Sequence, residues 1–500
     1  MLFLSLILEK MISESVKIHD KFSFEIKLGY ASDIEIKSPE YSINMYLFIP
    51  DSLDMNRFTY KSDDFYHDLK SNIRLMTPVY LLRDIYQGTD NPLNRLENSL
   101  QKIAKNPNKE NTEHYEFQIK MFGSIVKSAL RREVFHIKDN KINADINFLI
   151  RSYIKDINEI KEKYRKLRRI INVPTVNTKL LNIYLFGDEY LGNLMEKYTF
   201  RLLRYLRNKD YDQKYKIELL ELIKKEIDYK SSKDLPIVSD NYNNNEELLY
   251  RRSVLKKYIE SNLFLNTRQK KEGKLAEQII YGLAAGLAMI FATGIAFYTQ
   301  QEYGNFTMPF FFALVIGYMF KDRIKEISRV YFSGKYRRGH FDHKTQISSG
   351  KKHNIGYCKE SFSYIDEEKI SARIMKRRNR SHLTEIENNW IGEKVILYRK
   401  QIKLYGKKIK TVYKDYTING INDIARINIS RFLEKMTNPE IPMYFIDNEK
   451  YKKLYGNKVY HLNLILNFKT HDKEFFRRYR IVLNRDGIKR IQKIMIEPKN

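Results

Sequence analysis

Two apolar runs between residues 275 and 320 stand out from a chain that is otherwise rich in charged residues. The first runs from Ile279 to Tyr298 and contains only apolar or small side chains. About 20 helical residues cross a hydrocarbon core of about 30 Å. The second, Phe306 to Phe320, is shorter, so it spans only with little tilt or a thinned bilayer. The pattern predicts two transmembrane helices that form a hairpin around the polar link Thr299 to Asn305.

Basic residues flank both runs, whereas the link between them has no Lys or Arg. Positive residues remain on the cytoplasmic side of a membrane, so this asymmetry predicts a two-span protein of the inner or plasma membrane with both termini cytoplasmic. Anionic phospholipid is the expected partner of these side chains. A helical hairpin buried in a soluble protein is the alternative. The expected lipid contacts are Arg268, Lys270, Lys271, Lys274, Lys321, Arg323 and Lys325.

Small residues recur four apart in the first run, at Gly282 and Gly286 and again at Ala288 and Ala292. This spacing lets helix backbones approach closely inside a bilayer. The two pairs fit either packing within the hairpin or dimerisation. Neither run contains a charged residue, which argues against a channel or transporter because intramembrane charges mark ion paths.

The N-terminal half changes from a strand pattern to a helix pattern. Residues 1–60 alternate apolar and polar positions as a small β-rich element does, and Met1 or Met11 fits as the start. Residues 61–265 predict a helical bundle or stalk, with a heptad helix over 143–172. Its partner is either another helix of this chain or the same helix of a second copy. The heptad seam consists of Ile146, Ile150, Tyr153, Ile157, Ile160, Tyr164, Leu167 and Ile171.

Residues 335–500 predict a mixed α/β domain with β-hairpins, in which a Gly- and Lys-rich loop over 333–356 comes first. Two strands are expected around Gly406, at 394–405 and 409–418. A helix is expected from Asp423 to Met436, and a second hairpin over 459–469 and 475–483. The fold class is therefore an α+β membrane protein, with the transmembrane hairpin between two cytosolic regions.

The net charge of +29 suits anionic lipid or nucleic acid, although a Lys-rich and Ile-rich composition also arises from base composition alone. Helical spacing predicts one basic face from Arg373, Lys376, Arg377 and Arg380, which fits phosphate groups of lipid or nucleic acid. A solvated helix face is the alternative reading. The single cysteine, Cys358, excludes an internal disulfide.

Candidate chemistry is sparse. His340, Asp342 and His343 carry metal-binding atoms, but their spacing matches no metal motif, so they are weak candidates. The stretch Ser348 to Lys352 lacks the first glycine and the hydroxyl residue of a phosphate-binding loop. No catalytic motif is present, and no cofactor is expected.

Three functions fit these patterns. The first is a non-enzymatic, membrane-anchored scaffold or regulatory protein that faces the cytosol, with a protein partner or a second copy bound through the helical region. The second is a membrane-tethered enzyme acting on a phosphate-bearing or lipid substrate through the C-terminal domain. The third is a membrane-tethered nucleic-acid binder. The absence of a catalytic motif favours the first.

Overall fold

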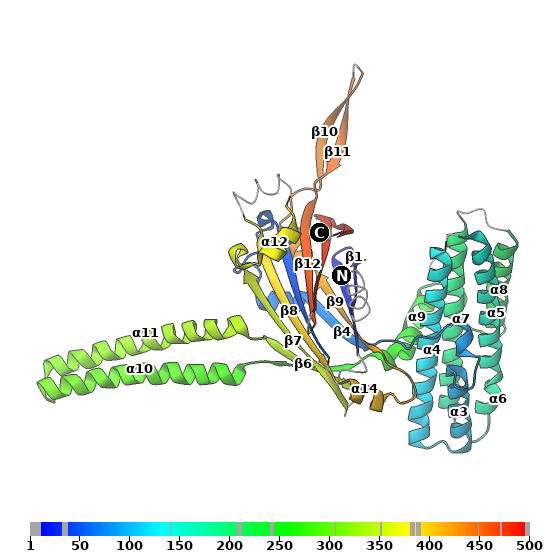
Figure 1. Cartoon of the computed structure of the whole chain (residues 1–500), viewed down its shortest axis with the longest axis horizontal. Helices are drawn as coiled ribbons and strands as arrows, with labels where there is room; N and C mark the ends of the chain where they lie inside the picture. The colour runs from blue at the N-terminus through cyan, green and yellow to red at the C-terminus, as the bar shows by residue number, and fades with distance from the viewer. Residues whose placement is uncertain are drawn as a thin grey trace. The chain divides into compact units, whose positions relative to one another are not determined.

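The computed structural model describes residues 12–32, 39–140, 142–207, 213–240, 245–305, 307–350, 353–380, 386, 392–448, 450–470 and 473–495 (Figure 1). The chain forms two compact units. Unit 1 comprises Met1–Ile73, Asn266–Lys414 and Gly420–Asn500, and unit 2 comprises Arg74–Leu265 and Asp415–Asn419. The segments expected as separate regions at 1–60 and 335–500 therefore belong to one unit. Residues 1–11 and Phe306, which the sequence predictions included, lie outside the described residues.

Unit 1 contains two sheets of four or more strands. The larger sheet has the strand order β14–β13–β12–β3–β8–β7–β6–β5, and the smaller has the order β1–β2–β9–β4. The N-terminal strand β3 lies between β12 and β8, which come more than 350 residues later. The strands are β1 Ile12–Asp20, β2 Ser23–Ala31, β3 Glu40–Ile49, β4 Leu69–Leu75, β5 Asn266–Lys271, β6 His343–Ser349, β7 His353–Ile365, β8 Lys394–Leu404, β9 Gly420–Asn428, β12 Tyr460–Thr470, β13 Lys473–Asn484 and β14 Gly487–Ile494.

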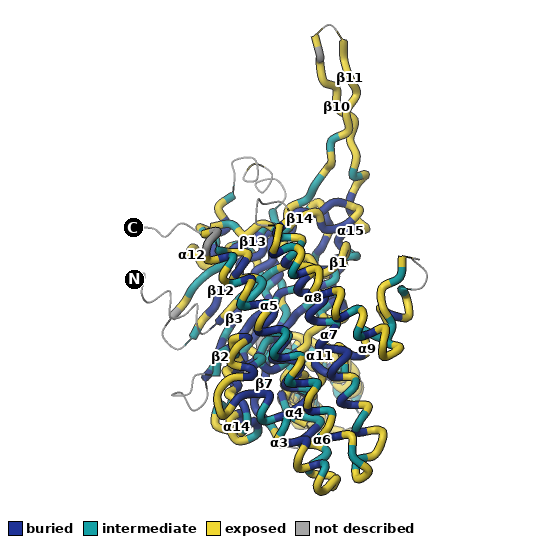
Figure 2. The backbone as a smooth tube through the Cα atoms, turned by 90° about the vertical axis from the view of Figure 1, so that its right-hand side faces the viewer, coloured by how far each residue is buried: buried dark blue, intermediate teal, exposed yellow. Residues whose placement is uncertain are grey.

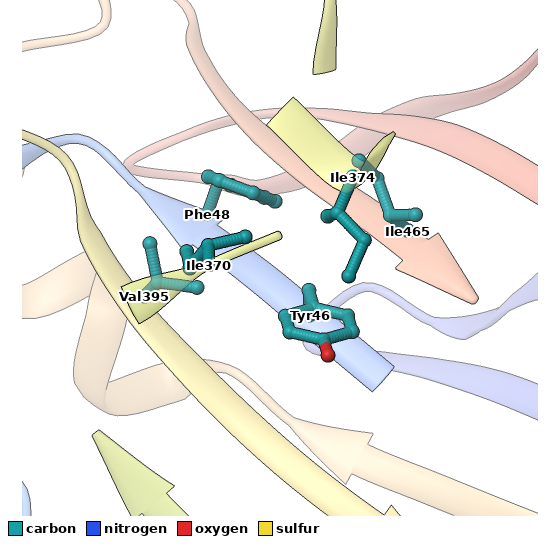
Figure 3. Close-up of a cluster of buried hydrophobic side chains, with 6 residues drawn as sticks. All are labelled: Tyr46, Phe48, Ile370, Ile374, Val395 and Ile465. Atoms are coloured by element: carbon teal, nitrogen blue, oxygen red, sulfur yellow. The ribbon is translucent and has the colours of Figure 1, made fainter. Parts of the chain in front are cut away.

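Side chains of the two sheets meet in the interior of unit 1. Tyr30 of β2 packs against Tyr41 of β3 with ring centroids 5.3 Å apart. Successive side chains of a strand point to opposite faces of its sheet. Both faces of the large sheet carry apolar residues, because its second face is also covered by other parts of the chain. On that second face, Ile370 and Ile374 pack against Tyr46 and Phe48 (Figure 3). This cluster fixes the short helix α12, Ala372–Arg378, over the sheet.

Two helices, α10 Lys274–Tyr303 and α11 Met308–Gly339, are inserted between the neighbouring strands β5 and β6 and pack along each other. Gly317 of α11 faces Ile295 of α10, and the Arg329 guanidinium lies 4.1 Å from the centre of the Tyr281 ring. This register places the charged half of α11 beside the apolar first half of α10.

The prediction of a two-span transmembrane hairpin in the inner or plasma membrane is wrong on this structure. Among the described residues, only the 27-residue segment Glu277–Tyr303 of α10 is long and apolar enough to cross a membrane. The apolar part of α11 ends after about 13 residues, or about 20 Å of helix, where Lys321, Asp322 and Arg323 begin. The paired helices therefore do not present two spans of about 30 Å.

Two strands, β10 Glu440–Asp447 and β11 Lys450–Asn457, form a separate two-stranded hairpin. Figure 2 shows that this arm is exposed along most of its length. Apolar side chains lie on both of its faces, because Met443 pairs with Leu454 and Ile446 with Tyr451. An isolated two-stranded hairpin is only marginally stable in water.

Unit 2 is mainly helical. Its helices are α3 Pro92–Lys105, α4 Lys109–Asp139, α5 Asn143–Lys166, α6 Arg168–Ile171, α7 Thr178–Leu206, α8 Gln213–Ser231 and α9 Asn245–Glu260. Asn91, Asn108 and Asn177 each cap a helix start by accepting a backbone N–H bond. Capping of this kind fixes where α3, α4 and α7 begin.

The eight heptad side chains from Ile146 to Ile171 are buried inside unit 2, against helices of the same chain. Two tyrosines join α5 to α7: the Tyr164 hydroxyl donates to the Tyr184 carbonyl at 2.9 Å, and the Tyr184 hydroxyl donates to the Tyr164 carbonyl at 2.7 Å. Their rings stack 4.9 Å apart. The seam is thus occupied within this chain.

Three local predictions in the C-terminal part are wrong. Residues after Gly406 form the helix α14, Gly406–Val412, and not a second strand. The segment from Asp423 lies in strand β9, followed by the short helix α15, Ser430–Glu434. The stretch 333–356 contains the end of α11 and strand β6, and is not one loop. The expected hairpin over 459–469 and 475–483 is present as β12 and β13.

Candidate functional site

A row of polar side chains crosses three neighbouring strands on the inner face of the large sheet. His343 of β6 is the register partner of Glu360 of β7, and Glu360 is the partner of Lys400 of β8. Register partners in an antiparallel sheet point to the same face. The row therefore brings together three titratable side chains that are far apart in the sequence.

Lys400 lies at the centre of a buried charge cluster. Its Nζ is 2.9 Å from Glu360 Oε1 and 2.5 Å from Asp423 Oδ2 of the opposing strand β9. The Tyr398 hydroxyl donates to Glu360 Oε1 at 2.6 Å, and the Ser71 hydroxyl donates to Asp423 Oδ1 at 3.1 Å. The side chains of Lys400, Glu360 and Asp423 are 4%, 8% and 1% exposed. Two carboxylates thus compensate one ammonium group in the interior.

Electrostatics fix the protonation states in this cluster. Burial opposes ionisation of Glu360, but the charge of Lys400 and the hydrogen bond from Tyr398 outweigh it and lower its pKa. Burial also opposes the charge of Lys400, yet Asp423 and Glu360 raise the pKa of this amine well above its usual value. Burial raises the pKa of the neighbouring Cys358 thiol. The amine is therefore charged and the thiol protonated at neutral pH, which leaves neither as an activated nucleophile.

A cavity of about 260 Å³ borders this cluster. The Tyr66 hydroxyl at its wall donates to Asp342 at 3.0 Å, and the Tyr66 ring meets the His343 ring edge-on at 4.4 Å. The chemistry of the lining suits a small polar molecule held by hydrogen bonds. The cavity is lined by Tyr66, Leu69, Ser71, Ile73, Thr267, Gln269, His343, Thr345, Cys358 and Glu360.

The weak metal candidates His340, Asp342 and His343 do not converge. Asp342 Oδ2 accepts hydrogen bonds from the Tyr66 hydroxyl and from the Phe362 backbone N–H at 2.7 Å, so this carboxylate has a structural role. His343 lines the cavity, and its Nδ1 is buried without a hydrogen-bond partner. In the parts of the chain that the structure describes, no three His, Cys, Asp or Glu residues are arranged to hold a metal ion.

The predicted lipid-contact residues lie on the elements that carry the helical hairpin. Arg268, Lys270 and Lys271 are exposed on β5, the edge strand from which α10 follows, and Lys274 begins α10. On α11, the Lys321 ammonium lies 3.9 Å from the centre of the Tyr318 ring. Its neighbours Arg323 and Lys325 are exposed. The basic residues thus flank the apolar part of the hairpin in the sequence and in the structure.

The small residues of α10 divide into two groups. Ala288 is 1% exposed, and the Ala292 carbonyl approaches Gly317 of α11, so these two positions face the partner helix. A methyl group added to Gly282 or Gly286 would meet nothing within 4 Å. The alanine pair therefore packs the hairpin, whereas the glycine pair lies on the open side of α10.

The expected basic face of residues 373–380 is only partly formed. Arg373 and Lys376 are exposed on α12. The Arg377 guanidinium lies 3.9 Å from the centre of the Phe476 ring. Arg380 follows the end of the helix and pairs with Glu393 at 2.9 Å and with Glu367. Because α12 ends at Arg378, helical spacing does not carry over to Arg380, and that side chain is engaged inside the fold.

Three arginines beside α12 were not predicted as site residues from the sequence. The positive charges of Arg378 on α12 and of Arg480 on β13 both lower the pKa of Arg478, which lies on β13 about 100 residues after Arg378. The alternation of Phe476, Arg478 and Arg480 within a predicted strand was the available signal, since it places all three on one face. The alternation does not indicate that a helix, α12, lies over this face of β13.

Comparisons with protein-family models, with curated proteins and with solved structures each find no match for this chain. The function must therefore be argued from its own residues.

Proposed function

We propose that this protein is a non-catalytic, membrane-attached scaffold or regulatory protein, and that α10 attaches it to lipid. The single observation that carries the proposal is the apolar surface of α10. Only 11% of its most apolar window is buried. The exposed fractions of Ile279, Ile290 and Phe297 are 64%, 70% and 71%. Each apolar Å² left in water costs about 25 cal/mol, so a lipid environment stabilises such a helix.

Two other kinds of apolar helix fit the chain less well. The core helix of a soluble protein is mostly buried, whereas α10 is mostly exposed. A signal sequence occurs near an N-terminus, whereas about 270 residues precede α10. The basic residues of β5 and α11 add attraction to anionic headgroups, at about 1 kcal/mol for each Lys or Arg near the surface.

The non-catalytic part of the proposal is supported by the Lys400 cluster. Its ammonium is paired with Glu360 and Asp423, and the Cys358 thiol is held protonated. The exposed apolar side chains of the β10–β11 arm offer a further surface, of the kind typical of protein interaction sites. These features favour a protein that binds over one that performs a reaction.

Two arginines introduced at exposed positions of α10 test the attachment. We expect the purified full-length chain to float with vesicles of phosphatidylcholine and phosphatidylserine in a density gradient. The variant Ile290→Arg with Phe297→Arg should remain at the bottom, because each arginine costs about 2.5–3.5 kcal/mol in the centre of a bilayer. Both side chains are largely exposed, so the substitutions leave the fold intact.

The matched control is Phe148→Arg on α5 of unit 2, where the side chain is 72% exposed. This variant should float as the wild type does. Equal flotation of the α10 variant and the wild type, or no flotation of the wild type, would overturn the proposal.

A further inference from the structure

Arginine side chains lie next to α12 on the second face of the large sheet, the face that α12 covers. Arg478 of β13 pairs in register with Ile465 of β12, a member of the apolar cluster under α12 (Figure 3). Arg480, two residues further along β13, points to the same face as Asn463 of β12. From above, the Arg378 guanidinium lies 5.7 Å from the centre of the Phe48 ring. Three guanidinium groups from two segments of the chain therefore share this face.

Glu393 forms ion pairs with Arg378 and Arg380, but Arg478 and Arg480 form none among the described residues. Arg378 Nη2 donates to Glu393 Oε1 at 2.6 Å, but its Nε is buried without a partner. Arg380 Nη2 donates to the other carboxylate oxygen, Glu393 Oε2, at 2.9 Å. Arg478 is only 4% exposed, and its Nε is buried without a hydrogen-bond partner. The Nε of Arg480 is likewise buried and unpaired.

Such an arrangement is costly without a counter-ion. A buried charge is tolerated in proteins when it is paired, and the removal of its partner is strongly destabilising. Burial, together with the charges of Arg378 and Arg480, lowers the pKa of Arg478 to about 10. Burial and the charges of Arg480, Arg490 and Arg378 also lower the pKa of His461 on the adjacent strand. An anion placed among these groups would relieve all of them at once.

We propose that Arg378, Arg478 and Arg480 form a binding site for a phosphate monoester group. The planar fork of arginine matches phosphate oxygens with two parallel hydrogen bonds. A compact terminal dianion suits guanidinium groups that are largely buried, whereas the backbone of a nucleic acid is usually bound by exposed Lys and Arg side chains. The group is carried by a free phosphate compound or by a phospholipid with a terminal phosphate, and the two sources share this chemistry.

This site is independent of the attachment through α10, because its arginines lie on α12 and β13. A failure of one proposal therefore leaves the other standing.

Thermal unfolding of the full-length chain in inorganic phosphate tests the site. We expect phosphate to raise the melting temperature of the wild type more than chloride does at equal ionic strength. The variant Arg478→Gln should lose this phosphate-dependent shift. Without phosphate it should melt above the wild type, since an unpaired buried charge has been removed. A residue with a merely structural role would show the opposite sign.

The neighbouring Arg477 is the matched control. Its guanidinium points away from α12 and pairs with Glu14 of β1 at 3.1 Å. Arg477→Gln should lower the melting temperature and keep the phosphate shift. Should Arg478→Gln not fold, Arg480→Gln serves in its place, because that side chain is only partly buried.

Vesicles distinguish the two sources. If a phospholipid is the ligand, the wild type should prefer phosphatidylcholine vesicles with phosphatidic acid, which ends in a phosphate monoester, over charge-matched vesicles with phosphatidylserine, and Arg478→Gln should lose this preference. If the phosphate shift occurs without this preference, the source is a soluble phosphate compound. The absence of both effects, or Arg478-dependent binding of a single-stranded oligonucleotide without a phosphate shift, would overturn the proposal.

Discussion

Replacement of Lys400 by methionine is expected to destabilise unit 1 by about 3–5 kcal/mol, the usual cost of breaking a buried ion pair from one side. Methionine fills a similar volume but leaves the carboxylates of Glu360 and Asp423 without their shared counter-charge in the interior. The free energy of unfolding, obtained from urea titration, measures the effect. Lys400 lies on β8, which pairs with β3 and β7 in the interior of the large sheet. The loss of its ion pairs should therefore destabilise the whole of unit 1.

An exposed ion pair provides the control. Lys369 pairs with Asp366 at 2.5 Å, but the two side chains are 69% and 49% exposed. Lys369→Met should therefore change stability by no more than about 1 kcal/mol. The triple variant Lys400→Met, Glu360→Gln and Asp423→Asn should regain most of the lost stability, because no buried charge remains. A Lys400→Met protein as stable as the wild type would show that the cluster is not compensated through this lysine.

The same cluster predicts acid sensitivity. The pKa of Glu360 is lower in the folded protein than the ordinary value of 4.5, so the folded state binds fewer protons than the unfolded state. Its contribution to stability is complete above about pH 4.5 and is lost as the pH falls through the folded pKa. We expect the unfolding free energy to decrease below about pH 4.5, and Glu360→Gln to remove this component. An unchanged pH profile in the variant would contradict it.

The double variant Ile157→Asp with Ile160→Asp is expected to unfold unit 2. Both isoleucines are fully buried in the heptad seam. The substitutions remove two buried aliphatic side chains, which costs about 2–5 kcal/mol for each, and add two buried carboxylates without partners. The sum is comparable to the total stability of a domain, about 5–15 kcal/mol. Circular dichroism should show a marked loss of helix, because unit 2 is helical.

Lys155→Asp is the control for this variant. Lys155 is exposed on the same helix, so an aspartate there remains hydrated and should leave the helical signal unchanged. Retention of full helicity in the double isoleucine variant would contradict a buried seam.

Local periodicity identified elements whose burial is one-sided and regular. The heptad positions from Ile146 to Ile171 are all buried. The hairpin of β12 and β13 is where the alternation placed it. Apolar residues recur about every 3.5 positions in the heptad helix and every 2 positions in the strands, because one face of each element packs against a neighbour. A sequence records that kind of packing well.

Elements buried on both faces were misread. In β9, Ile421, Ile424 and Ile427 recur at spacings of three, which imitates a helix. The strand is buried on both of its faces, so apolar residues appear at odd and even positions alike. The second apolar run ends at Phe320, as the sequence indicated, and lies inside the longer helix α11. The error was to count so short an apolar run as a second membrane span.

The candidate sites could not be predicted because they depend on distant pairing. Lys400 meets Asp423 only because β8 and β9 lie in different sheets that face each other. The charge of Arg378 acts on Arg478 only because α12 lies over β12 and its Arg377 lies over Phe476 of β13. Neither contact leaves a local pattern in the chain, and neither uses a spacing that a motif would describe.

Insertion of α10 into lipid is the central claim, and a fluorescent probe at Ile290 tests it most directly. The single native cysteine, Cys358, is 1% exposed, so a cysteine introduced by Ile290→Cys takes an environment-sensitive label selectively. We predict a blue shift on addition of vesicles and quenching by lipids that carry a nitroxide in the acyl chain, while the same label at Lys155→Cys in unit 2 remains unaffected. A label at position 290 that is indifferent to vesicles, as the control is, would contradict the claim.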